Sequence, residues 1–112
     1  MTREEQVSVI VPLYNHQHYI GRCIRSLINQ SFARARYEII VIDDGSQDDS
    51  VAALSPYLDD IILLRNRRNQ GLPATLNKAI KASRGQYVVR VDSDDFVHVD
   101  YLKVLHLFLT LN

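Results

Sequence analysis

Three aspartates within four residues, Asp92, Asp94 and Asp95, form the group in this sequence best suited to chemistry. They follow residues 87–91, a largely apolar run with strong strand preference. Two carboxylates about 4 Å apart near a protein surface repel by roughly 4 kcal/mol, and a bound dication turns that repulsion into attraction. Carboxylate oxygens suit Mg²⁺ or Mn²⁺. We therefore predict a buried strand whose tip holds a metal ion, with a solvated acidic turn as the alternative.

A second acidic pair, Asp43 and Asp44, also follows a predicted strand, over residues 37–42. The next residues, Gly45 and Ser46, are typical of a turn, so the pair has a purely structural explanation too. Because two acidic strand ends occur in one chain, we favour a functional role for the pair.

The elements that must position these carboxylates follow from the hydrophobic pattern. Two further β-branched or apolar runs, residues 7–13 and 61–64, predict strands, and Pro12 is expected to end the hydrogen-bonded ladder of the first. A helix is predicted after each strand. The first spans residues 19–30, and the second begins after a Ser46 or Asp48 cap and runs through Val51, Leu54 and Leu58. The third begins at Pro73, turns Leu76, Ala79 and Ile80 inward and stops at Gly85, and the fourth begins at Tyr101 with Asp100 as its N-cap.

Strands and helices therefore alternate along the chain, which predicts an α/β fold with a Rossmann-like parallel sheet, right-handed crossovers and helices on both faces. If the fourth strand lies beside the first, the strand order is 3-2-1-4. Ligands bind such sheets beyond the carboxyl ends of the strands, where the winding reverses. That point would bring residues 12–15 to residues 92–95, with Asp43 and Asp44 one strand away.

Composition narrows the possible partners and the compartment. Thirteen basic residues balance thirteen acidic ones, so we expect no nucleic-acid partner. The lone Cys23 suits a reducing compartment, and residues 1–6 are too polar for a secretory signal, so we expect a cytoplasmic domain, with the cytoplasmic face of a membrane as a possible place for a longer protein.

Residues 101–111 predict a helix that is apolar nearly all round. Such a helix is normally buried, and a chain that ends at Asn112 cannot cover it. We therefore expect either a truncated C-terminus or a homo-oligomer that forms through this helix.

Other polar residues give weaker signals. His16 and His18 are spaced as metal ligands can be, but no Cys or third His completes a site, so we predict loop residues. Arg65, Arg67 and Arg68 are expected to be solvated. Cys23 lies on the apolar stripe of its helix and is expected in the core.

Four motifs in order resemble the family 2 glycosyltransferases, whose nucleotide-sugar-binding domain has the fold called GT-A. The matching segments cover nearly the whole chain: residues 7–15, residues 43–50 with Asp-Asp-Gly-Ser, residues 69–77 and residues 85–95 with Asp-Ser-Asp-Asp. The resemblance implies that residues 1–112 are one domain, the N-terminal, nucleotide-diphospho-sugar-binding half of a GT-A domain. It also implies transfer of a sugar, with a UDP-sugar as the favoured donor, to an acceptor hydroxyl, usually with inversion.

By the same resemblance, Pro12 and Tyr14 would line the nucleotide pocket with Asn15 nearby. Asp44 would accept a hydrogen bond from the base, and Asp43 would support that loop.

Asp92 and Asp94 resemble the ends of the family's Asp-x-Asp motif, which holds Mn²⁺ or Mg²⁺. Asp94 would be the direct metal ligand, Asp92 would lie closer to the ribose, and Asp95 would lie behind the ligands or beside the donor sugar. The family's general base usually lies well beyond this motif, so we expect it, and the site for a glycan, lipid or other hydroxyl acceptor, outside these residues. The alternatives are a binding-only relative or another non-catalytic regulatory module. A receiver-like domain would need its acidic pair after the first strand, and a sugar-nucleotide synthase would need a Gly-rich loop there; residues 12–15 provide neither.

Overall fold

The secondary structure follows the predicted alternation of strands and helices. A computed structural model describes residues 6–111, and the expectation that residues 1–6 carry no secretory signal lies outside them apart from Gln6. The strands are β1 (Val7–Leu13), β2 (Tyr37–Asp43), β3 (Ile62–Arg65) and β4 (Tyr87–Arg90). The helices are α1 (Ile20–Ile28), α2 (Leu72–Ala82) and α3 (Tyr101–Thr110), with short 3-10 helices η2 (Arg34–Arg36) and η3 (Ala52–Tyr57).

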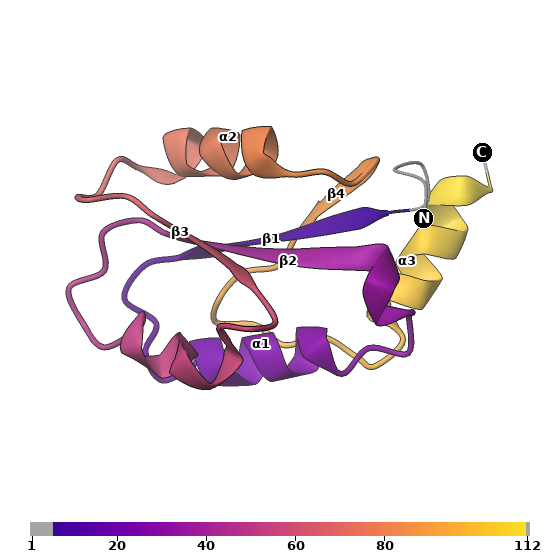
Figure 1. Ribbon diagram of the computed structural model, residues 1–112, viewed down its shortest axis with the longest axis horizontal. Coiled ribbons are helices and arrows are strands. Elements are labelled where there is room, and N and C mark those ends of the chain that lie inside the picture. Colours follow the sequence, from indigo (N-terminus) through magenta and orange to yellow (C-terminus); the bar gives the residue numbers. More distant parts are fainter. Residues whose placement is uncertain (1–5, 112) are drawn as a thin grey trace.

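All strand pairs are parallel, and the order is β3-β2-β1-β4, which confirms the predicted sheet. The chain winds from β1 through β2 to β3, and then returns through α2 to place β4 on the other side of β1 (Figure 1). The winding therefore reverses between β1 and β4, and their carboxyl ends lie side by side.

Helices cover both faces of the sheet, with α2 on one side and α1 with η3 on the other (Figure 1). A hydrophobic core lies on each face of the sheet, because successive side chains of a strand point to opposite faces. Val9 and Val11 pack on the α1 side, whereas Ile10 packs against Ala79 of α2. Burial on both faces explains why β1 and β2 read as continuous apolar runs.

Helix α1 forms because its apolar residues recur at helical spacing. Ile20, Cys23, Ile24 and Leu27 are all buried, while Arg22 and Arg25 on the other side are not. Burying one such aliphatic side chain contributes about 1.5–3 kcal/mol, so this stripe accounts for the attachment of α1 to the sheet.

Pro12 ends the ladder on one side of β1 only. Pairing with β2 continues through Pro12 and Leu13 as far as Asp43, so the expectation that the ladder stops at Pro12 is wrong on this side. Pairing with β4 ends at Ile10, whose carbonyl accepts the Val91 N–H. Bonding direction alternates along a strand, so Pro12 points its missing N–H toward β4, where no partner is needed.

The prediction that the strand at residues 87–91 is buried is wrong. Strand β4 is at the edge of the described sheet, it ends at Arg90, and Val88 and Arg90 are exposed. The inward stripe predicted for α2 is also partly wrong, because Ile80 is 49% exposed whereas Ala79 is buried.

Helix α3 leaves most of its apolar surface uncovered. Leu102 is its one buried residue, and Phe108 is 68% exposed. The structure therefore bears out an uncovered apolar helix, and a homo-oligomer through it stays a prediction. Among residues 6–111, no helix has the length and hydropathy needed to cross a bilayer.

The predicted helix caps form different contacts. Asp100 occupies the N-cap position of α3 but accepts a hydrogen bond from Ser31 instead of capping. No side chain caps η3; Asp48 accepts the Ser50 and Gln17 N–H groups, so it holds the loop before that helix.

Gly85 is required where the chain enters β4. A Cβ there would lie 2.7 Å from the Ser8 nitrogen and 2.9 Å from the Val7 carbonyl carbon, so the backbone of β1 would have to move. We expect Gly85→Ala to lower the free energy of unfolding by about 1–3 kcal/mol, the usual cost of overpacking.

Urea unfolding followed by circular dichroism measures this change. Gly21→Ala in α1 is the matched control: its Cβ would meet no backbone, only the end of the Arg25 side chain at 3.1 Å and the Tyr57 hydroxyl at 4.0 Å, and it should stabilise by about 0.5–1 kcal/mol. Equal stability of Gly85→Ala and the wild type would show that β1 and β4 are not packed this closely.

Candidate functional site

A cleft of 390 Å³ opens beyond the carboxyl ends of β1 and β4. It lies at the point where the winding of the sheet reverses, as expected for this topology. Five of the residues predicted for the site line it: Pro12, Tyr14, Asp44, Asp92 and Asp94. Residues that are 80 positions apart in the sequence therefore meet in one cavity.

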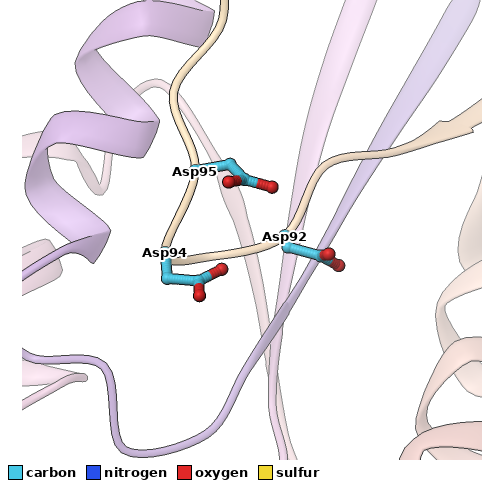
Figure 2. Close-up of side chains that lie close together, drawn as sticks. All are labelled: Asp92, Asp94 and Asp95. Carbon is cyan, nitrogen blue, oxygen red and sulfur yellow. The ribbon is translucent and has the colours of Figure 1, made fainter.

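The three aspartates after β4 form one acidic group. Each of Asp92, Asp94 and Asp95 offers a carboxylate oxygen, and these atoms lie within 4.8 Å of one another. Figure 2 shows the three side chains leaving the same loop. We call residues 92–95 the acidic tip.

The acidic tip fits a hard divalent cation. It offers only oxygen donors, as Mg²⁺ and Mn²⁺ prefer. Arg90 pairs with one oxygen of Asp92 at 2.8 Å, whereas Asp94 and Asp95 have no side-chain partner within residues 6–111. Asp94 is therefore the carboxylate of the cleft that is most available to an ion.

Asp44 is buried, at 6% exposure, and both of its carboxylate oxygens bond the loop between β3 and α2. One oxygen accepts hydrogen bonds from the Asn66 side chain (2.9 Å) and the Gln70 N–H (2.8 Å), and the other accepts the Gly71 N–H (3.1 Å). Thr75 lies in the same group and bonds Asn66.

These bonds set the charge of Asp44. Burial alone would raise its pKa, but the hydrogen bonds from Asn66, Gln70, Thr75 and Gly71 outweigh burial and lower the pKa below its usual value. Asp44 is therefore a carboxylate at neutral pH, and it presents a fixed acceptor to the cleft.

Asp43 and Asn15 act inside the neighbouring loops. Asp43 is buried and accepts the Ser46 N–H, which closes the turn after β2. Asn15 has a positive φ of 54°, and its side-chain oxygen accepts the Gln47 N–H while its own N–H bonds Ser46. Both predicted residues thus hold the loops around the cleft, and the positive φ suits Asn.

Tyr14 lies at the border of two cavities. It is 42% exposed and lines both the cleft and a neighbouring cavity of 580 Å³. The arginines predicted to be solvated, Arg65, Arg67 and Arg68, are exposed and line this second cavity.

His16 is a cleft residue that the sequence reasoning placed in a simple loop. Its Nδ1 shares a 2.6 Å hydrogen bond with the hydroxyl of Ser93, and it lines the cleft beside Asp92 and Asp94. Its position two residues after Tyr14, in the loop after β1, is the signal that could have identified it. The lining is completed by Leu13, Asn69, Gly71, Leu72, Thr75, Arg90 and Ser93.

Cys23 packs beneath the acidic tip as a protonated thiol. Burial, with the nearby charges of Asp95, Asp94 and Asp92, raises its pKa to about 12. The thiol donates a long hydrogen bond of 3.6 Å to the Asp92 carbonyl. The prediction of a small core residue is confirmed, and this contact adds a link to the site.

The chain is similar to solved glycosyltransferase structures. Staphylococcus aureus TarS, solved in complex with UDP and with UDP-GlcNAc, is 34% identical over 93% of this chain, with TM-scores of 0.86 and 0.85. A mannosyltransferase from Pyrobaculum calidifontis, PcManGT, in complex with GDP-Man and Mn²⁺, is 28% identical over 83% of the chain, with a TM-score of 0.76.

The chain covers 32% and 31% of the two TarS complexes and 28% of PcManGT. A poly(ribitol-phosphate) beta-glucosyltransferase of Bacillus spizizenii is 38% identical over 96 residues, which are 82% of this chain and 15% of that protein. This chain thus spans less than a third of each relative.

The GT-A architecture predicted from the motifs is confirmed by the TarS fold. The family model described as glycosyl transferase family 2 matches residues 8–110, nearly the whole described chain. The chain belongs to glycosyl transferase family 2.

Proposed function

We propose that this chain binds the donor of a sugar transfer, a nucleotide diphosphate sugar with a UDP-sugar favoured, together with Mn²⁺ or Mg²⁺. The observation that carries the proposal is the cleft itself, which joins the fixed Asp44 acceptor to the acidic tip in one cavity. The UDP and UDP-GlcNAc complexes of TarS and the GDP-Man and Mn²⁺ complex of PcManGT support it.

In this proposal the nucleotide base of the donor lies between Tyr14 and Asp44. Tyr14 offers a half-exposed aromatic face with Pro12 beside it, and the ionised Asp44 accepts an N–H from the base. Asn15 and Asp43 contribute by holding the loops that carry these two residues. The base end of the cleft is therefore formed before the ligand arrives.

The diphosphate lies at the other end of the cleft, at the acidic tip. Asp94 would bind the cation directly. Asp92 would bind the cation or the ribose through one carboxylate oxygen, while Arg90 holds the other oxygen of Asp92. The cation, when bound, stabilises the negative charge that develops on the leaving nucleoside diphosphate. Asp94 and Asp92 supply the negative charge that attracts it.

The acceptor half of the reaction needs a general base within hydrogen-bond reach of the attacking hydroxyl. Asp44 is engaged with its loop, and Asp92 and Asp94 are assigned to the metal. Because the family resemblance puts the general base well beyond the acidic tip, we place the general base outside these 112 residues. We propose a hydroxyl of a cell-surface polysaccharide or related polymer as acceptor, with inversion at the sugar, in the cytoplasm, where Cys23 stays reduced.

The metal assignment is tested by Asp94→Ala. Isothermal titration with UDP, in Mn²⁺ and in EDTA, should show tighter binding with Mn²⁺ for the wild type. In Mn²⁺, Asp94→Ala should lower the UDP affinity by at least roughly 10- to 100-fold, which is what removal of an outer-shell partner of a metal site costs in metal affinity. Asp59→Ala, an exposed aspartate outside the cleft, is the matched control and should bind as the wild type does. Mn²⁺-independent UDP binding by the wild type would contradict the assignment.

The role of Asp44 is tested by its pH dependence. Its folded pKa lies below its unfolded pKa of about 3.9, so its stabilising contribution is complete above that value and is lost as pH falls through the folded pKa. Asp44→Asn leaves buried N–H groups without a full acceptor and should cost about 1–3 kcal/mol near pH 7. The difference from the wild type in urea unfolding should shrink below pH 4; a pH-independent difference would show that its charge is not what holds the loop.

A general base outside these residues predicts that the chain binds the donor without turning it over. We expect a UDP-release assay with UDP-glucose and UDP-N-acetylglucosamine to give no more product with the wild type than with Asp94→Ala. Robust release by the wild type alone would show that a base lies within these residues.

A further inference from the structure

Two hydrogen bonds connect the acidic tip to residues that follow β1, one from His16 in the loop before α1 and one from Cys23 in α1. His16 Nδ1 and Ser93 Oγ are 2.6 Å apart, and the Cys23 thiol donates to the Asp92 carbonyl at 3.6 Å. The first is the shorter by far and joins side chains 77 residues apart in the sequence.

Ser93 is more buried than its neighbours in the acidic tip. Its side chain is buried, at 2% exposure, whereas Asp94 is exposed and the Asp92 side chain is 48% exposed. Asp94 has no side-chain partner among residues 6–111, so its direction depends on the backbone beside it. That backbone is anchored through Ser93.

His16 is itself held firmly enough to serve as the anchor. Its N–H donates to Ser50 Oγ at 2.9 Å, and its carbonyl accepts the Tyr19 and Ile20 N–H groups at 3.0 Å, where α1 begins. The imidazole meets the Tyr19 ring edge to face, with centroids 5.8 Å apart. His16 thus connects the loop after β2, the start of α1 and the acidic tip.

We propose that His16 is a positioning residue for the metal site and acts through Ser93 to hold Asp92 and Asp94 in the orientation that binds the cation. The inference rests on the proposed function. Groups that orient metal ligands typically change metal affinity by about 10- to 100-fold when they are removed. His16 would fill this role from a different element than the ligands, so the loop after β1 would fix the metal end of the cleft.

The test is a double-mutant cycle on metal binding. Isothermal titration measures the Mn²⁺ affinity of the UDP-saturated protein, and the UDP affinity in EDTA, for the wild type, His16→Ala, Ser93→Ala and the double variant. Each single variant should weaken Mn²⁺ binding by about 10-fold with an unchanged UDP affinity in EDTA, and the double variant should be no worse than either.

Two further variants separate positioning from folding. His16→Asn places a polar atom close to the position of Nδ1 and should restore most of the Mn²⁺ affinity. His18→Ala removes the exposed neighbouring histidine and should match the wild type. Urea unfolding of all variants shows whether a loss of affinity follows a loss of stability.

Three outcomes would overturn the proposal. Additive losses in the double variant would mean that His16 acts on the ligand directly. A Mn²⁺ affinity of His16→Ala equal to that of the wild type would remove the positioning role while the proposed function stood. A wild type that binds UDP with no effect of Mn²⁺ would defeat the proposed function and this inference together.

Discussion

The unequal pairing of β1 with its two neighbours is the constraint on which the site depends. Pairing with β2 continues to Leu13, whereas pairing with β4 stops at Ile10, where β4 ends, so β1 continues beyond the end of β4. Pro12 lacks an N–H and so requires no partner on the open side. The gap that results is lined by the residues that follow both strands, and the cleft needs no insertion or extra element to form.

The loops around the cleft are stabilised mainly by side chains that bond backbone groups. Asp43, Asp44, Asp48 and Asn15 each accept at least one N–H from a loop residue. Such bonds satisfy the polar backbone of segments that have no regular structure. Asp43 and Asp44, at the end of β2 and directly after it, therefore have the structural role that was weighed for them, and their functional role stays a proposal.

The sheet order and the acidic group could be predicted from the sequence because both depend on local patterns. Apolar runs give the strands, and the residues after them share one edge of a parallel sheet. The burial of β4 could not be predicted, because an edge strand with an apolar run looks like a central one until its neighbours are known. His16 was missed because its partner Ser93 is distant in sequence and neither residue is distinctive alone. The contact of Asp100 with Ser31 instead of a helix cap has the same origin.

The network around Asp44 means that the two ends of the cleft differ in stiffness. At the base end, three hydrogen bonds already fix the carboxylate and the loop from Asn66 to Gly71, so a ligand there loses little of its binding energy to ordering the protein. At the phosphate end, only the backbone beside Asp94 is anchored, through Ser93 and His16, and the Asp94 side chain itself has no partner among the described residues. If the proposed function holds, a preformed shape decides the recognition of the nucleotide base, whereas the supply of the cation decides the retention of the phosphates.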